Sequence, residues 1–179
     1  MDVAPLRAEP REDAEQVTQA LLGEPLEVVE TQAHWARVMT AYDYPGWVLA
    51  SQLEDGSGLI AADLSGSPVD VARRYLGSPY EWGGMTERGI DCSGLVHMSY
   101  RRVGRVIPRD AHQQAQFGTA VATPEPGDLA VYGDPVDHIA FWLGEGRILH
   151  STGRDGGLGV VEEVEPAELH GRRQRFVRL

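Results

Sequence analysis

Short apolar stretches separated by turn residues fill the first part of the chain. Strand-length stretches cover residues 17–22, 26–29, 35–39 and 46–50, and turn residues occupy 23–25, 32–34 and 42–45. Short strands joined by close turns are typical of a small antiparallel barrel. We therefore predict an all-β domain over residues 1–55, followed by a linker over residues 56–67, where Gly and Ser are frequent.

The pattern changes to helices from residue 68. Ser67 before Pro68 is a typical helix start, and the residues that follow continue a helix toward Gly77. A second helix is expected from Cys92, because the chain then lacks helix breakers until Gly104. A third short helix fits residues 110–117.

Strand patterns return after Gly127, over residues 129–132, 138–143, 147–151, 159–164 and 175–179. Helices first and strands later predict an α+β domain over residues 68–179.

Two histidines lie on neighbouring predicted strands. His138 opens one strand and His150 closes the next, with residues 144–146 as the turn between them. A three-residue turn pairs Leu143 with Arg147 and places both histidines on one face of the sheet, diagonally across the strand pair. A two-residue turn would place them on opposite faces, so the prediction depends on the turn.

Charge and composition narrow the function. The chain of 179 residues has a formal net charge of −11, and all 16 of its basic residues are arginine. Such a chain is a poor partner for nucleic acid or an anionic membrane, and the missing lysine excludes a P-loop and Schiff-base chemistry. A single cysteine fits a reducing compartment. The sequence shows no signal-peptide pattern and no long apolar span, so we expect a cytoplasmic protein.

That cysteine, Cys92, stands at the start of a predicted helix. Unpaired N–H groups and the helix dipole favour the thiolate there, and nearby glycines at 83, 84, 89 and 94 permit tight turns and close approach of a substrate. The alternative is a small buried apolar residue. Cys92, His138 and His150 can serve as nucleophile, base and orienting group, which is what thiol activation requires.

Two other functions of a cysteine are a zinc ligand and a phosphatase nucleophile. Cys92, His138 and His150 plus water would make a catalytic zinc site, although the chain lacks a close ligand pair of the CxxC or HxxxH kind. A phosphatase loop needs arginine six residues after the cysteine, where Met98 stands. We expect no metal and no cofactor.

Residues 68–179 resemble the NlpC/P60 cysteine peptidases, which cut bacterial cell-wall peptides. The resemblance rests on ordered motifs at residues 76–84 (LGSPYEWGG), 91–95 (DCSGL), 107–114 (IPRDAHQQ), 126–129 (PGDL), 137–140 (DHIA) and 149–151 (LHS). It implies a papain-like α+β fold with Cys92 as nucleophile, His138 as base and His150 as the third residue. It also places Tyr80 near the oxyanion site, although Tyr80 also fits as a half-buried aromatic beside Trp82.

The resemblance further implies substrate-binding positions. Asp91, Ser93, Arg109 and Asp110 match residues that help to hold substrate. The alternatives are structural: Asp91 and Ser93 as caps of the Cys92 helix, and Arg109-Asp110 as an ion pair. Ala111 departs from the serine found here in some members.

The first domain resembles a bacterial SH3 module, with residues 44–48 similar to its closing strand. In members with this module, the resemblance implies cleavage after γ-D-glutamate in short murein peptides, L-Ala-γ-D-Glu-diamino acid, with a free amine, in peptidoglycan recycling. A buried ammonium needs a carboxylate; Asp91 is the first candidate, and Glu15 and Tyr44 are weaker ones. Two alternatives stay open: an exported hydrolase or amidase acting on intact peptidoglycan, and a noncatalytic wall-binding module.

Overall fold

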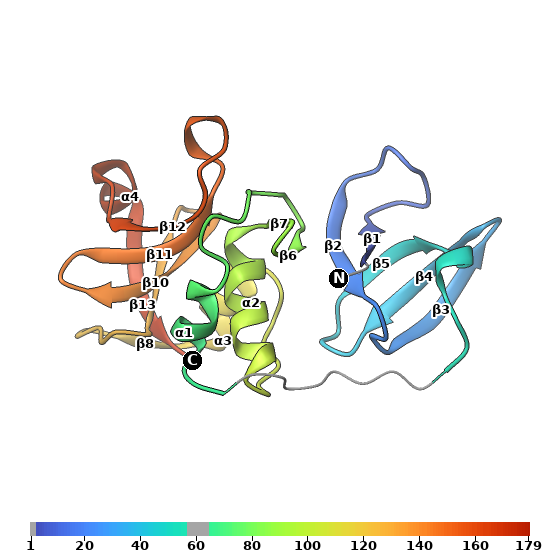
Figure 1. The fold of residues 1–179 in the computed structure, drawn as a ribbon, viewed down its shortest axis with the longest axis horizontal. Coiled ribbons are helices and arrows are strands. Elements are labelled where there is room, and N and C mark those ends of the chain that lie inside the picture. Colours follow the sequence, from blue (N-terminus) through green and yellow to red (C-terminus); the bar gives the residue numbers. More distant parts are fainter. Residues whose placement is uncertain (1–2, 57–64) are drawn as a thin grey trace.

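The computed structural model describes residues 3–56 and 65–179. Most of the predicted linker, residues 57–64, lies outside the described residues. A five-stranded sheet forms from the residues before this stretch and a six-stranded sheet from the residues after it (Figure 1), and the α+β fold expected from the sequence is confirmed.

Five antiparallel strands form the N-terminal domain, in the order β2-β1-β5-β4-β3. They are β1 (Val3–Arg7), β2 (Gln16–Leu21), β3 (Leu26–Gln32), β4 (Trp35–Thr40) and β5 (Pro45–Leu49), followed by the short 3-10 helix η1 (Ala50–Gln52). The four predicted strands are confirmed, and β1 was missed. The small core of this domain contains Leu6, Ala20, Ala36, Val38 and Val48.

Four helices follow in the C-terminal domain: α1 (Pro68–Arg73), α2 (Cys92–Arg102), α3 (Ala111–Phe117) and α4 (Ala167–Arg172). Ser67 caps α1 through a reciprocal capping box with Asp70, as its position before Pro68 predicted. The helix ends at Arg73, before the predicted end, and turns carry the chain to Gly77, whose φ is +84°. The sequence analysis did not predict α4.

A six-stranded sheet, ordered β12-β11-β10-β9-β13-β8, completes this domain. Its strands are β8 (Thr119–Val121), β9 (Leu129–Tyr132), β10 (His138–Gly144), β11 (Arg147–Thr152), β12 (Gly159–Val164) and β13 (Arg173–Arg178), with the short 3-10 helix η2 (Arg154–Gly156) after β11. A separate two-stranded hairpin, β6 (Met85–Thr86) and β7 (Gly89–Ile90), precedes the Cys92 helix.

The turn between β10 and β11 differs from the prediction. Gly144, not Leu143, pairs with Arg147, which leaves a two-residue turn. A register shift between Trp142 and Gly144 makes Leu143 a bulge, however, so Phe141 pairs with Leu149 as the longer turn would have required. The bulge therefore returns His138 and His150 to one face.

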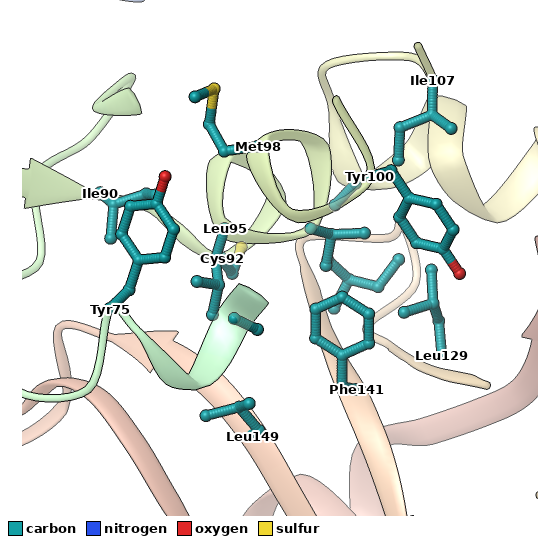
Figure 2. Packing of buried hydrophobic residues seen from close by; sticks show 14 of the residues in the cluster. Tyr75, Ile90, Cys92, Leu95, Met98, Tyr100, Ile107, Leu129, Phe141 and Leu149 are labelled. Atoms are coloured by element: carbon teal, nitrogen blue, oxygen red, sulfur yellow. The ribbon is translucent and has the colours of Figure 1, made fainter. Parts of the chain in front are cut away.

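Helix α2 lies between the six-stranded sheet and the N-terminal domain (Figure 1). One side packs Leu95 against sheet residues such as Phe141 and Leu149, in the buried cluster of Figure 2. The other side meets the N-terminal domain. There the His97 ring lies 4.5 Å from the Tyr42 ring, between centroids. Cys92, the first residue of α2, is thus held where the two domains meet.

Within the two described ranges, no helix is both long enough and apolar enough to cross a lipid bilayer.

Candidate active site

A cavity of about 260 Å³ opens where α2 begins. Cys92 lies in its wall, and the N-terminal domain supplies part of the lining. The lining residues are Glu15, Val17, Tyr44, Tyr80, Trp82, Asp91, Cys92, Ser93, Asp110, Ala111, His112, Val136 and Asp137. The sequence analysis had named seven of these as site residues, and the fold gathers them around one space.

The Cys92 thiol is buried, with 6% of the residue exposed. Desolvation and the neighbouring Asp91 carboxylate raise its pKa to about 12, against the opposing N–H groups of Ile139 and Ser93 and the charge of Arg109. The sequence analysis expected the helix start to favour the thiolate, but here burial outweighs the helix terminus. Near neutral pH the thiol is protonated, so its reaction needs a base.

His138 and His150 lie together, as predicted. His138 Nε2 is 2.8 Å from His150 Nδ1. The backbone N–H of Ile139, the residue after His138, acts on Cys92 and opposes the rise in the pKa of its thiol. With Nε2 engaged, Nδ1 is the ring nitrogen of His138 that is left to take a proton from the thiol.

Both histidines are neutral near neutral pH. Desolvation, followed by the nearby His150, Arg172 and Arg154, lowers the pKa of His138 to about 3. Desolvation also lowers the pKa of His150, although Glu163 opposes this shift. A neutral His138 can accept a proton, as a general base must.

The zinc alternative does not fit the hydrogen bonding. Both ring nitrogens of His150 are engaged, Nδ1 with His138 and Nε2 with Glu163 Oε1 at 2.9 Å. Metal ligation needs a free nitrogen lone pair. Among residues 3–56 and 65–179, no group of three or more His, Cys, Asp or Glu side chains is placed to hold a metal ion.

Asp91 and Arg109 form a buried ion pair that supports the Cys92 helix. Asp91 Oδ1 accepts the N-cap hydrogen bond from Gly94 N–H at 2.6 Å, and Arg109 donates to both carboxylate oxygens at 3.0 and 2.8 Å. Arg109 is only 1% exposed and also donates to Ser93 Oγ at 2.8 Å. It is absent from the cavity wall, so the predicted substrate contact of Arg109 is corrected to a structural one.

Tyr80 and Trp82 reach the cavity from the loop before β6. The Tyr80 ring packs against Gly153, and desolvation, then Cys92 and Asp91, raises the pKa of its hydroxyl. Trp82 donates from Nε1 to Glu15 Oε1 at 2.8 Å. The placement of Tyr80 beside Cys92 suits an oxyanion donor, and that role stays a prediction.

The N-terminal domain also meets the cavity through Tyr44. Its hydroxyl donates to the carboxylate of Asp110, 3.0 Å from Oδ2 and 3.1 Å from Oδ1. Desolvation raises the pKa of Asp110, although Tyr44 and Arg109 oppose this shift. Asp110 is also the N-cap of α3, so one side chain both caps this helix and lines the cavity.

The glycines around Cys92 permit close approach, but to the protein's own backbone. A Cβ on Gly94 would lie 2.4 Å from the carbonyl oxygen of Gly84, and one on Gly83 would lie 2.7 Å from that of Gln16. The space beside Gly94 and Gly83 is therefore filled by the protein's own backbone, although the sequence analysis had predicted the approach of a substrate backbone there.

Sequence analysis missed Glu163 and Arg154. Glu163 binds His150, and Arg154 Nη2 donates to both Glu163 oxygens at 2.9 Å. Strand alternation could have found Glu163: it pairs with Ile148, two residues from His150, which puts both side chains on one face. That needed the β11–β12 register, which the sequence alone did not supply.

Comparison with known proteins agrees with this architecture. The profile of the NlpC/P60 family matches residues 77–169, and that of the bacterial dipeptidyl-peptidase SH3 domain matches residues 6–53.

Two related proteins are similar to part of this chain. The chain is 38% identical to a probable endopeptidase of Corynebacterium glutamicum over 51% of this chain and 44% of that protein. It is 37% identical to a gamma-D-glutamyl-L-lysine dipeptidyl-peptidase of Bacillus subtilis over 60% of this chain and 40% of that protein. The chain thus spans less than half the length of these relatives.

A crystal structure of an NlpC/P60 family protein from Bacillus cereus superposes with a TM-score of 0.59 at 22% identity, covering 98% of this chain and 60% of that chain. That likeness shows the fold across both domains. Because the family profile covers more than half of the sequence, including Cys92, His138 and His150, the chain belongs to the NlpC/P60 family, with a bacterial SH3 domain in front.

Proposed function

We propose that this protein is a cysteine peptidase that hydrolyses the γ-D-glutamyl–diamino acid bond of short murein peptides with a free N-terminal L-Ala. The observation that carries the proposal is the shared cavity. Cys92 lies in its wall, and Glu15, Val17 and Tyr44 of the SH3 domain line it as well.

The chemistry follows from the positions of the side chains. His138 takes the thiol proton, and the sulfur attacks the carbonyl carbon of the scissile bond. The oxyanion forms beside Tyr80, and His138 returns the proton to the leaving amine, which leaves an acyl-enzyme for water to hydrolyse. His150 holds the ring of His138 throughout.

The size of the cavity favours a short substrate. About 260 Å³ is slightly below the roughly 300–1,000 Å³ of usual small-molecule pockets. The SH3 domain forms part of the wall, so a continuing glycan or peptide has little room on that side. This supports a substrate that ends one or two residues before the cleaved bond.

Carboxylates that line the cavity without an arginine partner among the described residues favour an ammonium group at that end. Asp91 was the first candidate, but its oxygens already accept from Gly83 N–H, Gly94 N–H and Arg109, which fill the lone-pair sites of a carboxylate. Asp110 and Glu15 also line the cavity, and neither forms an ion pair with an arginine within 4 Å in the described residues. We therefore assign the ammonium to Asp110 and Glu15, with Tyr44 orienting Asp110.

The names of related proteins support the same substrate class. The Bacillus subtilis relative is named for the γ-D-glutamyl-L-lysine bond, and the matching SH3 family is named for dipeptidyl-peptidases. A short free peptide as substrate suggests peptidoglycan recycling in the cytoplasm, as the sequence analysis expected.

The test compares L-Ala-γ-D-Glu-meso-diaminopimelate with the same peptide acetylated at its N-terminus. We expect cleavage of the free peptide only, and none by the Cys92→Ala protein with an unchanged circular dichroism spectrum. Equal cleavage of both peptides, or of neither, would contradict the proposal.

Asp110→Asn separates charge from structure. Asn also caps helices, so α3 should persist while the negative charge is lost. We expect KM for the free peptide to rise about tenfold, with a smaller change in kcat, since an ammonium–carboxylate contact is worth on the order of 1.5 kcal/mol. An unchanged KM would remove Asp110 from the ammonium site.

A further inference from the structure

A continuous row of hydrogen bonds runs behind His138. His138 Nε2 lies 2.8 Å from His150 Nδ1, and His150 Nε2 lies 2.9 Å from Glu163 Oε1. Arg154 donates to both oxygens of Glu163. The side chain of His150 is 0% exposed, so its ring exchanges hydrogen bonds with these neighbours rather than with bulk water. The proton on one ring therefore determines the proton on the next.

The carboxylate of Glu163 determines which atom donates and which accepts in each of these hydrogen bonds. Ionised Glu163 only accepts hydrogen bonds, so His150 Nε2 must carry a proton. Burial keeps His150 neutral, which leaves its Nδ1 without a proton. His138 Nε2 must then be the donor between the two rings. His138 Nδ1 is then unprotonated, and an unprotonated ring nitrogen is needed to accept the proton of the Cys92 thiol.

We propose that Glu163 is a positioning residue that, held by Arg154, sets the tautomers of His150 and His138 so that His138 Nδ1 can accept the proton of Cys92. The inference rests on the proposed function, in which His138 is the base. In this step the S–H bond breaks and an N–H bond forms at Nδ1. His150 and Glu163 neither gain nor lose a proton.

Arg154 is needed because a lone carboxylate would act differently. Next to an uncompensated charge on Glu163, His150 would bind a second proton more readily. Doubly protonated His150 donates from Nδ1, which forces His138 Nε2 to accept and moves the His138 proton to Nδ1. The positive charge of Arg172 also lowers the pKa of His138. Arg172 is itself paired with Asp137 at 2.6 Å. The Arg154–Glu163 pair thus protects the productive tautomer.

Glu163→Gln tests the inference, with Glu162→Gln as the matched control. Glu162 is the neighbour on β12 but contacts Arg73 and Arg147, each at 3.2 Å, instead of His150. In the Glu163→Gln protein, Arg154 should bind the amide oxygen and turn the NH₂ group toward His150. His150 Nε2 would then accept, and the tautomers of both rings would reverse.

The readout is alkylation of Cys92 by iodoacetamide, which is specific because the chain has one cysteine. At pH 7 we expect Glu163→Gln to react at least about tenfold more slowly than Glu162→Gln, since misplacing the proton of a catalytic histidine costs orders of magnitude in rate. Equal rates would overturn the inference. Alkylation needs no peptide, so the result stands even if the proposed substrate is not cleaved.

Nitrogen NMR of the unmodified protein provides a test that requires no variant. ¹⁵N shifts of the two histidines at pH 7 should show protons on His138 Nε2 and His150 Nε2. A proton on His138 Nδ1 would overturn the inference.

Arg154→Gln adds a dependence on pH that loss of structure would not produce. Its alkylation rate should match the unmodified protein at high pH and fall as His150 protonates at lower pH. A constant ratio between the two proteins across pH would exclude this role of Arg154.

Discussion

Arg109→Met should destabilise the protein strongly, because this guanidinium joins the two domains at the start of the Cys92 helix. Arg109 donates to Asp91, Ser93 Oγ, the Gly84 carbonyl and, across the domain boundary, Thr18 Oγ1 at 3.1 Å. Met fills a similar volume but supplies none of these hydrogen bonds. Asp91, 6% exposed, would keep its N-cap role with an unpaired buried charge.

The burial of this ion pair determines how much unfolding free energy the Arg109→Met protein should lose. Breaking a buried ion pair from one side costs about 3–5 kcal/mol, chiefly through the charge left behind. That is a large share of the roughly 5–15 kcal/mol that stabilises a typical domain. With a urea dependence of about 2 kcal/mol per molar, the unfolding midpoint should fall by about 1.5–2.5 M.

Urea unfolding followed by tryptophan fluorescence measures this change, since Trp35 and Trp47 report on the first domain and Trp82 and Trp142 on the second. Arg37→Met is the control, because Arg37 is 45% exposed in a surface pair with Glu30 and should cost under about 1 kcal/mol.

A double-mutant cycle then isolates the pair. Adding Asp91→Asn to Arg109→Met should restore part of the lost stability, with a coupling of about 1 kcal/mol or more. Additive effects, or an Arg109→Met midpoint equal to that of Arg37→Met, would refute the reasoning.

Three further predictions concern the domain contact, the helix start and the pH dependence. The side chain of Glu24 is fully buried against Arg101, and desolvation raises its pKa. Because this desolvation makes the charged form of Glu24 costly, Glu24→Gln should lower the urea midpoint less than Arg101→Gln, which leaves that charge buried and unpaired. The opposite order would contradict this. Gly94→Ala would press its Cβ against the Gly84 carbonyl and should cost roughly 1–3 kcal/mol in urea unfolding; a neutral effect would exclude the clash. Burial lowers the pKa of His138 to about 3, so kcat/KM should fall on the acid side well below pH 6; a limb near 6.5 would refute neutral His138.

Much of the fold could be predicted because local signals were strong. Strands β9 and β12 match the predicted residues 129–132 and 159–164, since apolar or β-branched runs there end at glycines or charges. Strand β1 was missed because Pro5 and short length weaken its pattern, and pairing with β2 stabilises it. Helix α4 was missed because its surface sequence carries no apolar stripe, and tertiary contacts such as the packing of Leu169 and the pairing of Arg172 with Asp137 hold it in place.

The family motifs supplied most of the predicted cavity residues, whereas side-chain geometry was predictable only where neighbouring strands determine it. The histidine pair came from one hairpin, and a bulge at Leu143 compensated for the wrong turn length. The position of Arg109 depends instead on hydrogen bonds to Thr18 and Gly84, which lie 91 and 25 residues away in the chain. Long-range hydrogen bonds of this kind leave no local pattern, so the partners of Arg109 could not be predicted, whereas the N-cap role of Asp91 was one of its two expected roles.

The SH3 domain contacts the segment that leads to Cys92 and also forms part of the cavity wall. Arg109 ties Thr18 on β2 to the carboxylate that caps the Cys92 helix. Gln19 Oε1 accepts from the backbone N–H of Met85, at the start of the hairpin that leads to Cys92. A displacement of β2 would therefore move Cys92 and the wall of the cavity together. One interface therefore holds both Cys92 and a wall of the cavity. For the proposed peptide substrate, changes that weaken this interface should reduce kcat as well as selectivity for the free amine.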